Sequence, residues 1–167
     1  LYVHDALTGL YNRRGFDSVS LEKYKRAKKE KKSFVIFAID MDNLKVVNDR
    51  FGHMNGDLAL RTIGEAMQAV AGKEDACARV GGDEYNVVGI GDMAEQFVKD
   101  FNGYLADFNE ESELPYLVKA SVGYCLLESE KERDLEDCVN AADGKLYEYK
   151  RDKKKKKLDN VLREMEG

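Results

Sequence analysis

One unbroken run of six apolar residues, Phe34 to Ile39, is followed within three positions by two aspartates, Asp40 and Asp42. A short continuous apolar run that ends in polar residues predicts a buried β-strand, here over residues 33–39. The run is far shorter than the roughly 20 apolar residues that a membrane-spanning helix needs. Because side chains alternate along a strand, both aspartates are expected on one side, so that one coordinates a ligand while the other caps the helix that follows.

Apolar periodicity and turn signals divide the rest of the chain into regular elements. Helices are predicted over residues 13–31, 44–51, 56–71, 92–109 and 134–152, and further strands over residues 76–80, 85–90 and 116–127. Asn12 is the expected N-cap of the first helix, and Gly52 is expected to end the second. This order mixes hairpin strands with helical crossovers, which predicts an α+β domain with helices packed on a largely antiparallel sheet.

The length and the cysteines favour one reduced domain. The 167 residues suit a single domain, and neither a repeat nor a proline-rich linker divides them. The three cysteines, Cys77, Cys125 and Cys138, are odd in number and widely spaced. This pattern favours packing residues of a cytoplasmic domain over disulfides or a zinc site.

The charges are distributed unevenly. Seven of the eight residues 150–157 are basic, whereas acidic residues outnumber basic ones 31 to 20 in the rest of the chain. An acidic body is a poor binder of nucleic acid or of an anionic membrane, because such binding depends on an extensive basic face. The lysine run 153–157 is therefore expected to be a solvated helix end or tail.

A second polar cluster, Gly81-Gly82-Asp83-Glu84, lies between two predicted strands. This pattern predicts a hairpin in which the glycines supply positive φ angles. If strand 33–39 pairs beside the hairpin, Asp40 and Asp83 meet at one rim of the sheet. Carboxylates with a backbone carbonyl form a magnesium site that leaves positions open for water and phosphates. Such a site with two ions suits phosphoryl or nucleotidyl transfer.

A third cluster spans residues 44–57. Lys45 lies within a few residues of the predicted metal ligands, where it can meet a phosphate, and the first amides of the short helix offer a second anion contact. A carboxylate at Asp57 and an amide at Asn48 match the donors and acceptors of a guanine edge. Each residue alone is typical of a solvated surface, and it is their order along the chain that favours a nucleotide site.

Four motifs together resemble the GGDEF domain, the diguanylate cyclase module. They are Asp5-x-Leu7-Thr8-Gly9-Leu10-Tyr11-Asn12-Arg13-Arg14-x-Phe16, Asp40-Met41-Asp42-x-Leu44-Lys45-x-x-Asn48-Asp49-x-x-Gly52-His53-x-x-Gly56-Asp57, Arg79-x-Gly81-Gly82-Asp83-Glu84-Tyr85 and Ala142-Asp143-x-x-Leu146-Tyr147-x-x-Lys150. The resemblance implies a fold like the nucleotide cyclase palm, with a ferredoxin-like core. It also implies condensation of two GTP into cyclic di-GMP, with release of two pyrophosphates, by a homodimer whose subunits each hold one GTP.

The resemblance also implies roles for individual residues. The metal ligands fall on the side chain of Asp40, the carbonyl of Met41 and the side chain of Asp83, with Glu84 near a second ion; two Mg²⁺ are expected, or Mn²⁺ in their place. Asp83, Glu84 and Lys45 are the expected catalytic residues. The expected substrate-binding residues are Asn43, Leu44, Lys45, Asn48, His53, Asp57, Lys150 and Lys154. The sequence leaves open whether Asp83 accepts the proton of the attacking hydroxyl or holds the ion that acidifies it.

The sequence departs from the family pattern in three places, and two of them, Tyr85 and the altered end of the last helix, support a second hypothesis: a catalytically silent GTP-binding sensor or interaction module. Tyr85 stands where the name motif has phenylalanine, and the lysine run replaces the usual end of the last helix, with Lys154 in place of a distal arginine. The family's product-inhibition site needs an arginine where this chain has Gly72, although its aspartate is present as Asp75. No high-affinity inhibitory site is therefore expected, and Lys73 offers at most a weaker contact.

The resemblance extends over residues 1–167, which are expected to form one catalytic domain of a longer protein. A sensor domain is expected upstream, and the full-length protein is a candidate for membrane anchoring outside this domain.

Overall fold

The apolar run lies at the centre of a four-stranded antiparallel sheet. In the computed structural model, which describes residues 2–166, the strand order is β2-β3-β1-β4. The strands are β1 (Phe34–Met41), β2 (Ala76–Arg79), β3 (Glu84–Ile90) and β4 (Ala120–Leu127). β1 pairs antiparallel with β3 on one side and β4 on the other. The predicted antiparallel α+β architecture and the pairing of the first strand beside the hairpin are both confirmed.

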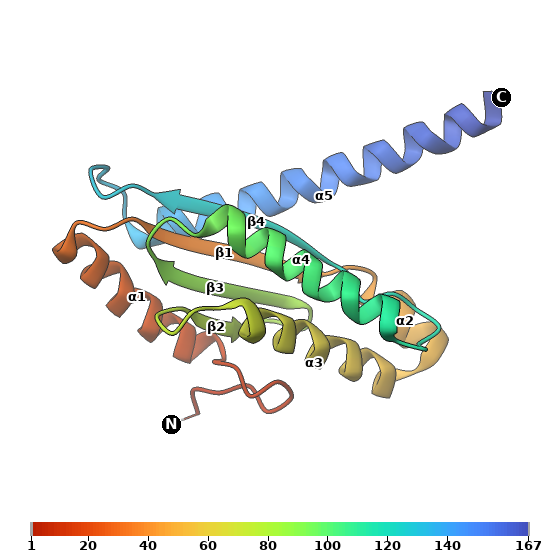
Figure 1. Cartoon of the computed structure of the whole chain (residues 1–167), viewed down its shortest axis with the longest axis horizontal. Coiled ribbons are helices and arrows are strands. Elements are labelled where there is room, and N and C mark those ends of the chain that lie inside the picture. The colour runs from red at the N-terminus through yellow and green to blue at the C-terminus, as the bar shows by residue number, and fades with distance from the viewer. Residues whose placement is uncertain (1, 167) are drawn as a thin grey trace.

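Helices cover both faces of the sheet (Figure 1). They are α1 (Arg13–Glu30), α2 (Leu44–Phe51), α3 (His53–Val70), α4 (Ala94–Glu111) and α5 (Leu135–Glu166). One apolar core joins the sheet to α2, α3 and α4, and a second core joins the opposite face to α1 and α5. β1 is therefore buried on both faces, which explains why it is an unbroken apolar run.

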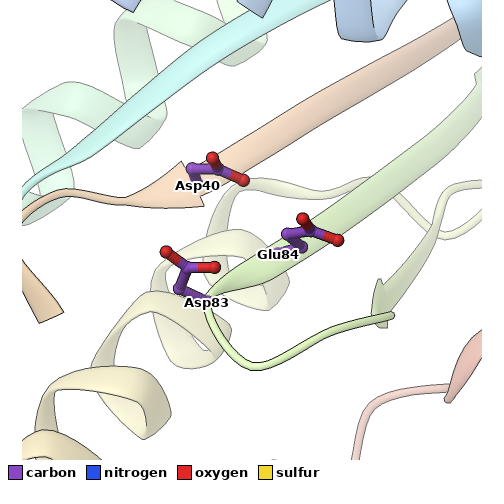
Figure 2. Close-up of side chains that lie close together, drawn as sticks. All are labelled: Asp40, Asp83 and Glu84. Atoms are coloured by element: carbon purple, nitrogen blue, oxygen red, sulfur yellow. The ribbon is translucent and has the colours of Figure 1, made fainter. Parts of the chain in front are cut away.

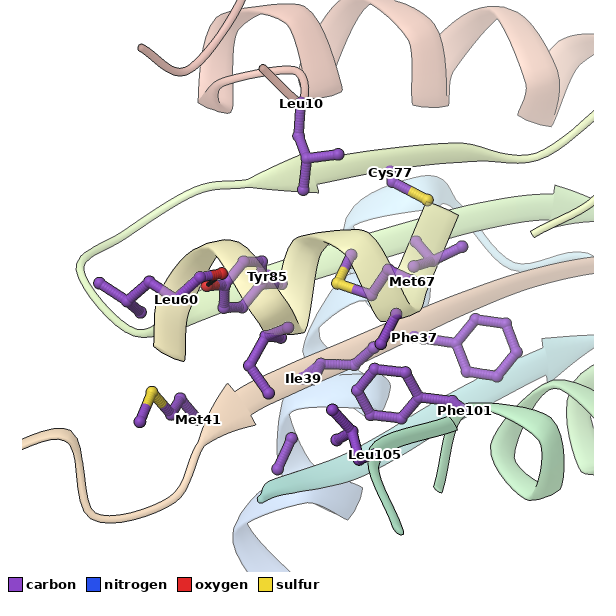
Figure 3. Close-up of a cluster of buried hydrophobic side chains, with 14 of the residues drawn as sticks. Leu10, Phe37, Ile39, Met41, Leu60, Met67, Cys77, Tyr85, Phe101 and Leu105 are labelled. Carbon is purple, nitrogen blue, oxygen red and sulfur yellow. Dashed lines mark hydrogen bonds between the residues drawn. The ribbon is translucent and has the colours of Figure 1, made fainter. Parts of the chain in front are cut away.

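Alternation along β1 decides which core each side chain enters. Phe37, Ile39 and Met41 belong to the core under α3 and α4, which Figure 3 shows, whereas Ile36 and Ala38 belong to the core under α1 and α5. Asp40 is in phase with the second set, so it lies on the α1–α5 face. This alternation places the Asp40 carboxylate at the end of the buried strand β1 and keeps it out of the core under α3 and α4.

Two predicted boundaries are wrong for local reasons. β4 begins at Ala120 rather than residue 116. The Asn109 side chain donates to the Val118 carbonyl (2.9 Å) and accepts from the Val118 amide (2.8 Å), which replaces strand pairing there. α5 continues to Glu166 instead of ending near residue 152, because residues 145–166 contain many good helix formers and neither glycine nor proline.

The lysine run forms part of the exposed end of α5, which projects from the body in Figure 1. This confirms the expectation of a solvated helix end. Within residues 2–166 no helix combines the length and the apolar character needed to cross a bilayer. The three cysteines are buried and free, as expected.

The predicted caps and turn angles are only partly correct. The Asn12 side chain accepts a hydrogen bond from the Gly15 amide, and Gly52 follows the last residue of α2 with φ 89°, both as predicted. Neither Asp42 nor Asn43 makes a side-chain cap at α2; the cap residue, Asn43, has φ 60° and leaves the first amides without a side-chain partner. The hairpin glycines do not have positive φ, so the reason given for them is also wrong.

Gly123 lets α5 pack directly on β4. A Cβ atom at this position would lie 2.2 Å from the Leu146 amide nitrogen and 2.7 Å from the Ala142 carbonyl oxygen. Backbone atoms cannot yield as a flexible side chain can, so the close approach of helix to strand requires glycine.

We therefore expect Gly123→Ala to lower the free energy of unfolding by about 1–3 kcal/mol, the usual cost of overpacking. Urea unfolding measures this loss. Gly103→Ala is the matched control: Gly103 is exposed in α4, and a Cβ atom added there would meet nothing within 4 Å, so the change is expected to stabilise by up to about 1 kcal/mol. Equal effects of the two substitutions would contradict this account of α5 packing.

Candidate functional site

Three carboxylates converge at one end of the sheet. Asp40 lies in β1, Asp83 in the hairpin turn and Glu84 at the start of β3, and one oxygen of each lies within 4.8 Å of the others. Figure 2 shows the three side chains together at the rim. The register pairs Asp40 with Glu84 across the two strands. The predicted meeting of Asp40 and Asp83 at one rim is therefore observed.

Backbone hydrogen bonds hold the hairpin turn in place. The Met41 amide donates to the Asp83 carbonyl (2.9 Å), and the Val80 amide donates to the Glu84 carbonyl (2.8 Å). A Cβ at Gly81 would lie 2.8 Å from a carboxylate oxygen of Glu84. The missing side chain of Gly81 thus leaves room for Glu84 in its present position, and the backbone there is not left-handed.

Arg79 also holds the hairpin turn in place. Its guanidinium donates twice to the Gly82 carbonyl, at 3.1 and 2.8 Å, and pairs with Asp5 at 2.9 Å. The other oxygen of Asp5 accepts from the Thr8 amide (2.9 Å) and hydroxyl (2.7 Å). The opening motif thus positions Gly82, the residue directly before Asp83.

This network lowers the pKa of Asp5. Burial raises that pKa, but the Thr8 hydrogen bonds and the Arg79 charge outweigh burial. The ionised carboxylate is therefore the form that the folded chain favours, and it holds Arg79 against the turn.

Two lysines of α5 reach the end of β1. Lys150 pairs with Asp40 and Lys153 with Asp42, each at 2.7 Å. Asp42 also accepts from the Ser121 hydroxyl (2.7 Å). Asp40 and Asp42 thus lie on the same side, as predicted, but Asp42 binds α5 and β4 rather than capping α2.

The surroundings raise the pKa of Lys150. Burial lowers it, but the hydrogen bond and charge of Asp40 outweigh burial. The charges of Asp83 and Asp42 act in the same direction. Lys150 therefore stays cationic beside the carboxylates.

Sequence reasoning chose Lys154 as the second cation of α5, and it missed Lys153. Lys154 is exposed and has no ion pair among residues 2–166. Lys153 follows Lys150 by three residues and so shares its helix face, which is the signal that could have identified it. The spacing to Asp42 could not, because 111 residues separate the pair.

The predicted base-recognition residues lie where α2 meets α3. A Cβ at Gly56 would lie 1.8 Å from the Asn48 side-chain oxygen, so only glycine admits Asn48 beside the first turn of α3. Asp57 follows Gly56 and is exposed. Asn48 and Asp57 are thus brought to one helix junction.

Of the remaining predicted residues near α2 and α3, Asn43, Lys45 and His53 are exposed, whereas Leu44 is half-buried and packs against the core. Lys45 is exposed and pairs with Asp49 at 2.8 Å, so this contact directs its ammonium along α2. Asn43 is exposed, Leu44 begins α2, and His53 is exposed at the start of α3. The first amides of α2 remain an anion-binding candidate because no side chain caps them.

Two departures from the family pattern have a structural explanation. Tyr85 is buried, and its hydroxyl donates to the Leu60 carbonyl of α3 (2.7 Å), so the extra oxygen is satisfied inside the core. Asp75 accepts from the Gly72 amide (2.7 Å), and its other oxygen would lie 2.5 Å from a Cβ at Gly89. Asp75 thus accepts a hydrogen bond within its own loop, residues 72–75, which precedes β2.

The carboxylate cluster fits a divalent cation. Its donors are hard oxygens, the type that magnesium and manganese prefer, and their spacing allows them to share one ion. Asp40 is 18% exposed, so the cluster is open to water and to a ligand on one side.

Three comparisons with known sequences indicate the same family. The sequence profile described as "Diguanylate cyclase, GGDEF domain" matches residues 2–156. Diguanylate cyclase DgcP of Escherichia coli (strain K12) is 32% identical over 160 residues, 90% of this chain and 45% of that protein. Diguanylate cyclase DgcS of Shewanella oneidensis is 30% identical over 152 residues, 87% of this chain and 49% of that protein. The chain spans less than half the length of these two relatives.

Solved structures agree with the fold. A microbial GGDEF domain, solved in a study of its interaction with cyclic di-GMP, is 32% identical, with a TM-score of 0.77 over 90% of this chain and 94% of that one. Diguanylate cyclase SiaD of Pseudomonas aeruginosa, solved with its activator SiaC, is 29% identical, with a TM-score of 0.79 over 90% of this chain and 58% of that one.

We expect Asp40→Asn to weaken Mn²⁺ binding by at least about 10-fold, the loss typical of changing even an outer partner of a metal site. Electron paramagnetic resonance of free Mn²⁺ measures the affinity. Asp107→Asn, an exposed change on α4, is the control and should leave it unaltered. Equal affinities of the two variants would rule out the cluster as the ion site.

We expect Asp5→Asn to lower the free energy of unfolding by about 1.5–3 kcal/mol at neutral pH, because charged hydrogen bonds to Thr8 and Arg79 are lost. The folded pKa of Asp5 is below its ordinary value of 3.8. Its contribution is therefore present above pH 3.8 and disappears as the pH falls through the folded pKa. Urea titrations at several pH values should show the gap between variant and parent closing below pH 3.8; a gap that persists there would refute this origin.

Proposed function

Because the chain belongs to the GGDEF family, whose sequence profile covers residues 2–156, we propose that it condenses two GTP into cyclic di-GMP. Two pyrophosphates are released, and the reaction takes place in a homodimer whose subunits each hold one GTP. The observation that carries the proposal is the convergence of Asp40, Asp83 and Glu84 at the sheet rim beside Lys150.

The reaction consists of two equivalent steps. In each, the 3′-oxygen of one GTP bonds to the α-phosphorus of the other, the bond from that phosphorus to the bridging oxygen breaks, and pyrophosphate leaves. The hydroxyl loses its proton beside Asp83, whose carboxylate either accepts it or holds the ion that acidifies the hydroxyl. Both routes require the carboxylate of Asp83 at the turn.

Asp40, the Met41 carbonyl, Asp83 and Glu84 are our candidates for holding two divalent ions per half-site, Mg²⁺ or in its place Mn²⁺. Such ions would neutralise phosphate charge and lower the pKa of the attacking hydroxyl. Glu84 belongs to the same cluster and is assigned to the second ion.

The triphosphate is assigned to the cations and amides around the rim. Lys150 already lies 2.7 Å from Asp40, so its ammonium is beside the carboxylate where the phosphates would arrive. The uncapped amides of Asn43 and Leu44 supply neutral donors. Lys45 and His53 are exposed at the starts of α2 and α3, Lys154 is exposed within α5, and the three complete the proposed phosphate contacts.

Guanine is assigned to Asn48 and Asp57. Asn48 offers both a donor and an acceptor, and the carboxylate of Asp57 accepts the two N–H donors that guanine presents and adenine lacks. The closeness of the Asn48 side chain to Gly56, the residue before Asp57, supports this assignment.

The regulatory setting is also a proposal. The chain spans less than half the length of DgcP and of DgcS. A longer protein of this kind has room for an upstream sensor domain. We assign the domain to the cytoplasm, where GTP is available, with no contact to nucleic acid or membrane.

A silent GTP-binding module remains the second candidate, and the altered end of α5 is the observation that favours it. Lys153, rather than a distal arginine, makes the ion pair next to the site, and lysine lacks the bidentate fork of arginine. Tyr85 does not favour the silent module, because its hydroxyl donates a hydrogen bond to the Leu60 carbonyl inside the core.

We expect Asp83→Ala to reduce formation of cyclic di-GMP by about 100-fold or more, the contribution of a positioned proton acceptor. Products from GTP and Mg²⁺ are identified by mass spectrometry for the chain alone and fused to a dimerising coiled coil. Asp107→Ala is the matched control. Unchanged turnover of Asp83→Ala would refute its role, and GTP binding without product in the fused parent chain would establish the silent module.

A further inference from the structure

A cleft of about 600 Å³ lies on the α1–α5 face of the sheet, beyond the carboxylate cluster. It exists because α1 packs mainly over β2 and β3, whereas α5 packs mainly over β4 and β1. The cleft lies between the two helices and is lined by side chains of both. Clefts of 300–1,000 Å³ with apolar walls are the usual size for small-molecule sites.

The walls of the cleft are largely apolar. Phe16 and Leu21 contribute from α1, and Val139 and Leu146 contribute from α5, over a floor that includes Ala38. Phe16 and Leu146 are otherwise buried, so their surfaces toward the cleft are ordered by the core behind them. A ligand with an apolar body would gain by covering this surface.

The charges around the cleft are mostly negative. Asp17, Glu136 and Asp143 line its helices, and Arg13 is the one cation among the lining residues. Asp40 and Glu84 also line it, and Lys150 pairs with Asp40. An anionic group would therefore be repelled, and a cation would be attracted.

We propose that this cleft is a second binding site, for a small organic cation that carries a protonated amine on an apolar body. The apolar walls take the body, and the carboxylates of Asp17, Glu136 and Asp143 take the ammonium. This site uses residues of α1 and α5 that the proposed GTP site does not use, adjoins that site at Asp40 and Glu84, and does not depend on the proposed activity.

The cleft is coupled to the carboxylate cluster through a shared wall. Asp40 and Glu84 belong to both. A cation in the cleft and a divalent ion at the cluster therefore repel each other, so each lowers the affinity of the other by the same factor. The amine would in this way oppose metal loading.

The test uses the whole chain and two probes, 4-phenylbutylamine and its uncharged analogue 4-phenylbutan-1-ol. Methyl NMR titrations report where each binds. We expect shifts at the methyl groups of Leu21, Val80 and Val139, and tighter binding of the amine than of the alcohol. Shifts confined to Val161 and Leu162 on the exposed end of α5, or equal affinity for the two probes, would overturn the proposal.

Two variants separate the apolar and charged contributions. Asp143→Asn should weaken the amine about 2–5-fold, as expected for one partly exposed charge, and leave the alcohol unchanged. Val139→Trp should fill the cleft and abolish binding of both probes, whereas Val161→Trp on the projecting helix should not. Since Asp143 is exposed, its variant keeps the test decisive if Val139→Trp fails to fold. Unaltered amine affinity in Asp143→Asn contradicts the charge assignment.

Adding Mg²⁺ completes the experiment. We expect Mg²⁺ to weaken binding of the amine and leave binding of the alcohol unaffected, because only the amine carries a charge that an ion at Asp40 and Glu84 repels. Equal weakening of both probes, or of neither, would contradict the coupling between cleft and cluster. Neither result depends on cyclic di-GMP formation.

Discussion

The antiparallel register of β1 and β3 is the constraint on which the site depends. It places Asp40 opposite Glu84 and leaves Asp83 at the adjoining turn. A slip of one residue would turn Asp40 toward the core of α3 and α4 and expose an apolar neighbour in its place. Alternate burial of Phe37 and Ala38 on opposite faces therefore fixes the register, and core packing determines where the carboxylates meet.

Clustered carboxylates repel one another, and the surrounding structure offsets that repulsion in two ways. Lys150 brings a cation from α5, which Gly123 allows to lie directly on β4. Arg79 holds the turn through Gly82 and is itself held by Asp5. The first residues of the chain and its last helix thus both contribute to one rim, although they are remote in sequence from Asp83.

Local patterns predicted much of this structure. The apolar run identified β1, Asn12 was correctly assigned as a cap, and the convergence of Asp40 with Asp83 followed from strand pairing. The pairing of Lys153 with Asp42 and the role of Arg79 were missed, because both depend on contacts between distant segments. The start of β4 was misplaced for a more local reason, since the Asn109 side chain replaces a strand partner at Val118. Gly81 was expected for the wrong reason: its missing side chain makes room for Glu84, a contact that only three-dimensional structure reveals.

The central claim is that strand register creates a divalent-ion site beside a guanine-binding helix junction. Diffraction from crystals soaked with Mn²⁺ and a non-hydrolysable GTP analogue, recorded at the manganese absorption edge, tests it most directly. The account predicts anomalous peaks between Asp40, Asp83 and Glu84, with the guanine ring against Asn48 and Asp57. Manganese bound away from these carboxylates, or a base placed elsewhere, would contradict it.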